Sequence, residues 1–193
     1  TMNPGYVGRT ELPDNLKALF RPCAMMIPDY TLIGEVLLYS YGFMNSKSLG
    51  IKATQAMKLA SEQLSSQDHY DFGMRGLKSV ILAAGQLKMY YGEAEHVSED
   101  QVALQAFLEV NEPKLVAQDL QLFQGIVADL LPGVIRPAET RASLETAITD
   151  ASKELNLQCT ADHMTKTVQL WNTLLSRHGL MTVGLPPSGK SSM

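Results

Sequence analysis

The sequence lacks the features that define secreted, metal-binding and membrane-spanning proteins. It has only two cysteines, Cys23 and Cys159, which lie far apart without a C-x-x-C spacing. This pair predicts neither a disulfide framework nor a zinc site, and it is typical of a reduced, cytosolic compartment. No apolar run approaches the roughly 20 residues of a membrane-spanning helix, and the first residues do not have the pattern of a signal peptide. The four histidines show no metal-ligand spacing.

Clusters of basic residues are absent too. Lys and Arg are scattered along the 193 residues, and the formal net charge is −4. We therefore expect no nucleic-acid surface and no membrane partner. A hydrophobic content of 45% and a charged content of 19% indicate a globular chain that can bury a core and form one or two domains.

Apolar residues recur at spacings of three and four over most of the chain, which predicts a mainly helical fold. The expected helices cover residues 13–20, 28–43, 46–64, 71–91, 117–131, 137–156 and 162–178, with one more that opens at Ser98. Ser98-x-x-Gln101 resembles a capping box, and Thr160 is expected to cap the last helix. The boundary between two structural units is expected at residues 132–137.

Two further expectations concern apolar side chains. Residues 180–183, Leu-Met-Thr-Val, form a short apolar run of the kind that becomes a buried parallel strand. Trp171 shares a helix face with Val168 and Leu175, so we expect it in the core. The ten methionines are also expected to fill the core.

The strongest motif lies at residues 184–191, Gly-Leu-Pro-Pro-Ser-Gly-Lys-Ser, which fit the pattern G-x-x-x-x-G-K-[ST]. In such a phosphate loop Gly184 and Gly189 let backbone N–H groups curl around a polyphosphate, Lys190 neutralises its charge and the Ser191 hydroxyl reaches Mg²⁺. The motif stands so close to the end of the sequence that we expect a piece of something larger. A Pro/Gly/Ser-rich tail is the alternative interpretation.

Four runs of sequence carry a resemblance to a known family, and they cover most of residues 1–90: 1–22, 25–30, 37–43 and 62–80. The runs resemble dynein heavy chain, and the amino-acid sequences of the two longest, 1–22 and 62–80, are distinctive. The Thr-Glu-Leu-Pro at 10–13 and the Phe-Arg-Pro at 20–22 resemble the axonemal branch more than the cytoplasmic one.

The resemblance implies a place within the AAA+ motor ring. Residues 1–27 would be the C-terminal end of the first large subdomain, 28–133 its helical small (lid) subdomain, and 134–193 linker helices with the first strand and phosphate loop of the second module. The implied fold is mainly α, a helical lid flanked by fragments of α/β large subdomains. The intact ring would bind ATP or ADP with Mg²⁺.

The resemblance also assigns roles to single residues. Asn3 matches the sensor-1 position, Arg75 the sensor-2 position and Arg21 the arginine finger, which would face the sixth module across the ring. An amide can orient the attacking water, and a guanidinium can offset charge on the transferred phosphoryl group. Simpler interpretations stay open: Asn3 as a turn residue before Pro4, and both arginines as solvated side chains on helices.

The implied function is part of an ATP-driven microtubule motor in the cytoplasm, cytoskeleton and the axoneme of a cilium or flagellum. The implied partners are neighbouring AAA+ modules of the same chain, dynein light and intermediate chains, and microtubules through distant parts of the protein. The 193 residues alone are expected to be inactive as an ATPase, because the first module's phosphate loop and catalytic carboxylate would precede Thr1.

Two other classes remain open. One is an all-helical adaptor or scaffold whose Gly/Pro/Ser tail only mimics a phosphate loop, and Arg75 buried in a packed helix seam would favour it. The other is a protein-remodelling AAA+ ATPase, which would share the sensors but not the wording of residues 62–80.

Overall fold

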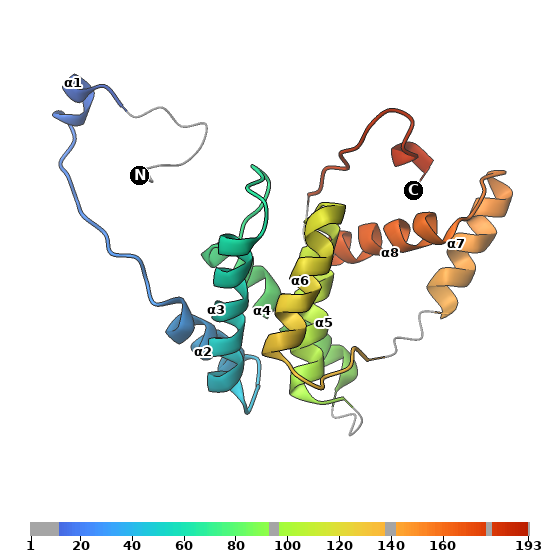
Figure 1. Ribbon diagram of the computed structural model, residues 1–193, viewed down its shortest axis with the longest axis horizontal. Helices are drawn as coiled ribbons and strands as arrows, with labels where there is room; N and C mark the ends of the chain where they lie inside the picture. The colour runs from blue at the N-terminus through green and yellow to red at the C-terminus, as the bar shows by residue number, and fades with distance from the viewer. Residues whose placement is uncertain (1–11, 93–96, 138–141, 177–178, 193) are drawn as a thin grey trace.

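The computed structural model describes residues 12–92, 97–137, 142–176 and 179–192 of the chain (Figure 1). The helices are α1 (Asp14–Lys17), α2 (Tyr30–Ser40), α3 (Ser46–Gln63), α4 (Met74–Tyr91), α5 (Glu99–Asn111), α6 (Ala117–Leu130), α7 (Ala142–Glu154) and α8 (Ala161–Ser176). Two short 3₁₀ turns, η1 (Glu112–Lys114) and η2 (Lys190–Ser192), complete the elements. The prediction of a mainly helical chain is confirmed.

The described part of the chain contains no β-strand, so the strand predicted at residues 180–183 is wrong: these residues are irregular. The physical reason is that a parallel strand needs a neighbour to satisfy its backbone hydrogen bonds. No other strand among the described residues is available to pair with this apolar run.

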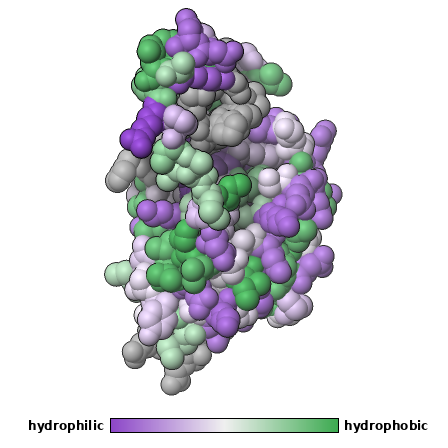
Figure 2. Space-filling view, turned by 90° about the vertical axis from the view of Figure 1, so that its left-hand side faces the viewer, coloured by the Kyte–Doolittle hydropathy of each residue, from purple (hydrophilic) through white to green (hydrophobic). Residues whose placement is uncertain are grey.

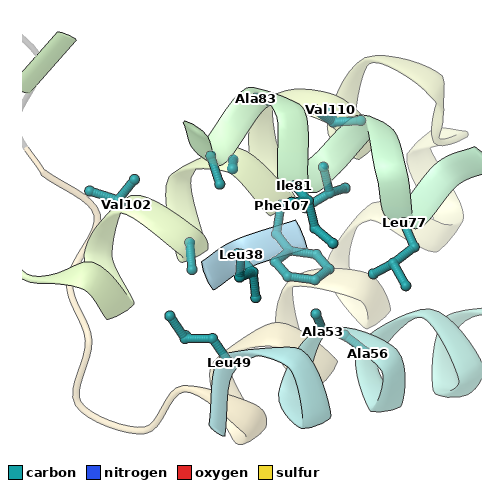
Figure 3. Packing of buried hydrophobic residues seen from close by; sticks show 14 of the residues in the cluster. Leu38, Leu49, Ala53, Ala56, Leu77, Ile81, Ala83, Val102, Phe107 and Val110 are labelled. Atoms are coloured by element: carbon teal, nitrogen blue, oxygen red, sulfur yellow. The ribbon is translucent and has the colours of Figure 1, made fainter. Parts of the chain in front are cut away.

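Helices α2 to α5 form the main core (Figure 3). The Phe107 ring of α5 lies at the centre of this cluster, close to Leu38 of α2 and Ala53 of α3. Helices α2 and α3 approach closely because Gly50 has no side chain: a Cβ there would lie 3.0 Å from the backbone nitrogen of Glu35. Full burial of each large apolar side chain contributes about 1.5–3 kcal/mol.

A second cluster joins α3, α5 and α6. Its buried members are Ala60, Leu64, Leu104, Phe123, Val127 and Leu131. The two clusters together use residues from Leu38 to Leu131, so the packed bundle is made by α2 to α6.

Helix ends follow the predicted capping signals. The Ser98 hydroxyl accepts from the Gln101 backbone N–H, and the Gln101 side chain accepts from the Ser98 N–H, which completes the capping box. The Thr160 hydroxyl accepts from the His163 N–H at 3.2 Å and caps α8 as predicted. The Asp29 carboxylate caps α2 without having been expected to do so.

Helices α7 and α8 pack against each other, and α8 also contacts α5 and η1. Trp171 of α8 is 49% exposed, so its predicted place in the core is wrong. The reason is that the contacts of α8 with α7, α5 and η1 leave none of its described side chains fully buried. The methionine prediction holds for Met57, but five others are exposed because they lie outside the packed bundle or on its outer surface: Met25, Met26, Met44, Met89 and Met181.

A cleft of about 290 Å³, lined by both polar and apolar residues, lies between α8 and the end of α5. Arg136, in the segment that leads from α6 toward α7, lies 3.8 Å from Glu109 and 3.6 Å from Glu112. Nearby, the Gln101 amide donates to the Ile135 carbonyl oxygen at 3.1 Å. Charged and amide groups therefore hold this connecting segment against the bundle.

The face that carries α1 and α2 exposes apolar side chains between polar ones (Figure 2). On α2 these are Leu32 and Val36, one helical turn apart, and just after α1 they are Leu19 and Phe20. None of the helices in the described residues combines the length and apolar composition that crossing a membrane requires.

An ion pair fixes the turn between α2 and α3. The Lys88 ammonium donates to Glu99 at 2.7 Å and to the carbonyl oxygen of Gly42, while the two Glu99 oxygens accept from the N–H groups of Met44 and Asn45 at 2.9 Å. Burial alone would raise the pKa of Glu99, but these hydrogen bonds, led by the one from Lys88, hold it below its ordinary value.

We predict that Glu99→Gln lowers the free energy of unfolding at pH 7 by about 1–2 kcal/mol, because charge-assisted hydrogen bonds are lost. A lowered folded pKa means that the stabilisation is complete above the unfolded pKa of about 4.3 and disappears as pH falls through the folded value. Urea denaturation at pH 7 and at pH 3 measures this difference. Glu62→Gln, in an exposed pair with Lys58, is the control, and an equal loss there would contradict the prediction.

Candidate functional site

The predicted phosphate loop is a compact curl in the structure. Gly189 has a φ of +76°, a left-handed conformation that glycine adopts without strain. A Cβ at Gly184 would lie 2.8 Å from the Ser188 hydroxyl oxygen, so these two residues face each other closely across the loop. The Ser188 N–H donates to the Leu185 carbonyl oxygen at 3.0 Å, and the turn η2 follows directly.

The Lys190 ammonium is folded back onto this loop. It donates to the carbonyl oxygens of Gly184 and Leu185 at 2.8 and 2.9 Å, and it lies 3.3 Å from the Ser188 hydroxyl. A cation at this point binds oxygen atoms that a phosphate group could equally supply. The loop thus has a cation, Lys190, bound to exchangeable oxygen acceptors, and the exposed Ser191 follows it directly.

Arg75 lies in the first turn of α4 and is exposed. The N-cap of this helix is Gly73, whose N–H donates to the Asp71 carboxylate at 3.2 Å. A Cβ at Gly76 would collide with the Asp71 carbonyl oxygen, so the preceding loop lies directly against the first turn of the helix. The backbone of this loop thus determines where α4 begins and, with it, where Arg75 lies.

A buried carboxylate anchors the same loop from the other side. Asp119, in the first turn of α6, accepts from the Ser65 N–H at 3.3 Å, the Ser65 hydroxyl at 2.5 Å and the Tyr70 hydroxyl at 2.8 Å. The Tyr70 oxygen accepts in turn from the Val116 N–H at 2.9 Å. We call Ser65, Tyr70, Val116 and Asp119 the Asp119 network.

Hydrogen bonds and burial shift the pKa values of the two ionisable groups in this network, Asp119 and Tyr70. The Ser65 hydroxyl, with further donors from Tyr70 and the Ser65 N–H, holds the pKa of Asp119 below its ordinary value although burial opposes this. Burial and the neighbouring Asp119 raise the pKa of Tyr70, while the Val116 N–H lowers it. Asp119 is therefore a carboxylate and Tyr70 a neutral phenol at pH 7.

The sequence as a whole matches one family, described as the hydrolytic ATP binding site of dynein motor region, over residues 1–191. The chain belongs to this dynein family. It is 53% identical to dynein axonemal heavy chain 1 and 52% identical to dynein axonemal heavy chain 3, both of Homo sapiens, and 48% identical to dynein axonemal heavy chain 12 of Rattus norvegicus. Each match covers the whole chain but only 4–6% of the dynein's own length.

The predicted resemblance to dynein heavy chain is thus confirmed, and the relatives named above are axonemal dyneins. The family description implies an ATP-binding site.

The structure does not bring the predicted dynein site residues together. Asn3 lies outside the described residues. Arg21 is exposed in an irregular segment that follows α1, four residues after that helix ends, so it is not on a helix as expected. The segment around α1 and the terminal loop lie on opposite sides of the helical bundle (Figure 1), while Arg75 belongs to the bundle itself.

Sequence reasoning missed the Asp119 network altogether. Its side chains come from residues 49 to 54 positions apart, and no local pattern links them. The one available signal was an acidic residue in the first turn of α6, where a carboxylate is ordinarily placed to favour the helix dipole. No group of three or more His, Cys, Asp or Glu residues in the described part of the chain could hold a metal ion.

Proposed function

We propose that this chain supplies the lid and sensor part of the hydrolytic ATP site of an axonemal dynein motor, together with the phosphate loop of the next site in the ring. The observation that carries the proposal is the match of residues 1–191 to the hydrolytic ATP-binding region of dynein motors. The place of Arg75 supports it, because this residue is exposed at the start of α4.

In this proposal Arg75 is the sensor-2 residue. A guanidinium at the first turn of a lid helix can bind the nucleotide of its own module, so the loss of the γ-phosphate changes the contact that holds the lid. Asn3 would orient the attacking water as sensor 1, and Arg21 would act as a finger toward the neighbouring module's nucleotide. The exposed, non-helical segment around Arg21 is compatible with a contact to another module.

The proposed domain division is residues 1–27, 28–133 and 134–193. The two core clusters support the limits of the middle domain, residues 28–133, because every buried member of the clusters lies between Leu38 and Leu131. Helices α7 and α8 add no side chain to either cluster. A strand at 180–183 is not part of this proposal.

The terminal loop would hold ATP or ADP with Mg²⁺ at the second site. When bound, the Mg²⁺–nucleotide supplies the phosphoryl group and a divalent charge. Gly184 and Gly189 would bring the backbone N–H groups close, Lys190 would exchange its loop carbonyl partners for phosphate oxygens, and the Ser191 hydroxyl would bind the metal.

We propose neighbouring AAA+ modules of the same heavy chain as the partners of the exposed apolar face on α1 and α2. We propose two further kinds of partner for the intact heavy chain. These are dynein light and intermediate chains, and microtubules, which distant parts of the motor would contact. The proposed location is the cytoskeleton of the axoneme, as the names of the relatives suggest. The adaptor alternative loses its expected support, since Arg75 is exposed and not buried in a helix seam.

We predict that the 193-residue chain alone does not turn over ATP, because it contributes only part of the first site and only the loop of the second. The measurement is phosphate release from Mg²⁺–ATP, with and without Lys190→Ala. Lys166→Ala, an exposed lysine on α8, is the matched control. Sustained turnover that Lys190→Ala abolishes and Lys166→Ala leaves intact would show a complete site at the terminal loop and overturn the proposal.

A further inference from the structure

The loop from residue 64 to 73 is the only covalent path from α3 into α4, so its shape decides where the first turn of α4 lies. The loop contains no helix or strand, only a turn at residues 68–69. Two of its attachments to the bundle, Ser65 at its beginning and Tyr70 in its second half, are bound to the same carboxylate.

We propose that Asp119 is a positioning residue for Arg75: by holding Ser65 and Tyr70 it fixes the loop that sets the start of α4. This inference rests on the sensor role proposed for Arg75. Asp119 itself is buried at 8% exposure and belongs to α6, so it acts through the loop and not on a ligand.

The chain between the anchor and Arg75 is short and well constrained. After Tyr70, the Phe72 side chain packs against both core clusters, and the rings of Tyr70 and Phe72 meet edge to face at 5.5 Å. Asp71 then contacts the first turn of α4 through its carboxylate and its carbonyl oxygen. We expect a displacement of Tyr70 to reach the helix start, because Asp71 and Phe72 are themselves in contact with the helix and the core.

The carboxylate has a property that an amide of the same size lacks. Asp119 accepts on both oxygens, with the Ser65 N–H on Oδ1 and two hydroxyls on Oδ2. An asparagine has one acceptor oxygen and presents two N–H donors in place of the other. Asp119→Asn therefore keeps the shape of the side chain but removes its charge, and it cannot accept the present hydrogen bonds at both oxygen positions.

The neighbouring contact of His69 with the Lys114 carbonyl oxygen, at 2.9 Å, ties the same loop to η1. It leaves the loop attached to the bundle when Asp119 is changed. We therefore expect Asp119→Asn to loosen the loop without unfolding the protein.

The test uses the intact dynein heavy chain that carries this segment, with Asp119→Asn, Tyr70→Phe and the control Asp129→Asn, an exposed carboxylate on the same helix. We expect kcat for ATP to fall about tenfold in Asp119→Asn and less in Tyr70→Phe, with KM changed less than twofold, since small misplacements of a functional group reduce turnover strongly. Hydrogen exchange should become faster in residues 64–76 for Asp119→Asn and stay unchanged for Asp129→Asn.

A double variant separates this proposal from the proposed function. If Asp119 acts through Arg75, Asp119→Asn has no further effect on kcat in an Arg75→Ala background. An equal loss in both backgrounds would overturn the positioning role, as would faster exchange in the loop with unchanged kcat. If Arg75→Ala itself leaves kcat unchanged, the sensor role fails independently of the loop. Should Asp119→Asn fail to fold, Tyr70→Phe in the two backgrounds gives the same test.

Discussion

Arg75→Ala in the intact heavy chain should lower kcat for ATP by about 100-fold, the loss typical of removing one donor that stabilises developing charge. The folded structure should not change, because Arg75 is an exposed side chain whose removal leaves the core of α4 in place. The measurement is microtubule-stimulated and basal ATP turnover at saturating nucleotide, together with the thermal midpoint of each variant.

Lys78→Ala provides the matched control for this prediction. Lys78 is also basic, exposed and near the start of α4, so its removal changes the net charge equally. We expect turnover within a factor of two of the unmodified protein. Similar losses in both variants would indicate a general electrostatic effect and contradict a specific role for Arg75.

Phe123→Ala should lower the free energy of unfolding of the bundle by about 3–5 kcal/mol, because a large aromatic side chain leaves a cavity that its neighbours fill only partly. Phe123 is 0% exposed and sits where α6 packs on α3 and α5. Since small domains are stable by only about 5–15 kcal/mol, this loss should move the denaturation midpoint visibly. Urea denaturation followed by circular dichroism measures it.

Leu122→Ala is the control, since Leu122 neighbours Phe123 on α6 but is 44% exposed. We expect this change to cost less than about 1 kcal/mol. A loss for Phe123→Ala no larger than that for Leu122→Ala would mean that α6 is not part of a cooperative core.

Local patterns in the sequence were sufficient to predict the helices and most of their ends. The capping box at Ser98 and the hydroxyl cap at Thr160 involve residues three apart, so a linear sequence contains all the information they need. Apolar spacing likewise predicted α3 and α4, whose buried residues recur on one face. The phosphate-loop motif and the runs that resemble dynein are also contiguous in the sequence, so they could be recognised without the fold.

Features that depend on distant partners were not predictable in this way. The apolar residues 180–183 match a strand pattern, yet pairing is decided by whether another strand lies alongside. Trp171 matches a core pattern, yet its exposure is decided by how much of α8 its neighbours cover. Asp119 is an ordinary helix-start carboxylate until the fold brings Ser65 and Tyr70 to it.

The cleft between α8 and the end of α5 has a mechanical consequence. Its walls carry Glu109, Glu112 and Arg136, and the ion pairs of Arg136 with the two glutamates are partly solvated. Water can replace such contacts at small cost, whereas parting two apolar faces would expose a core. Raising the salt concentration should therefore weaken the hold on the connecting segment at Arg136 before it affects any helix.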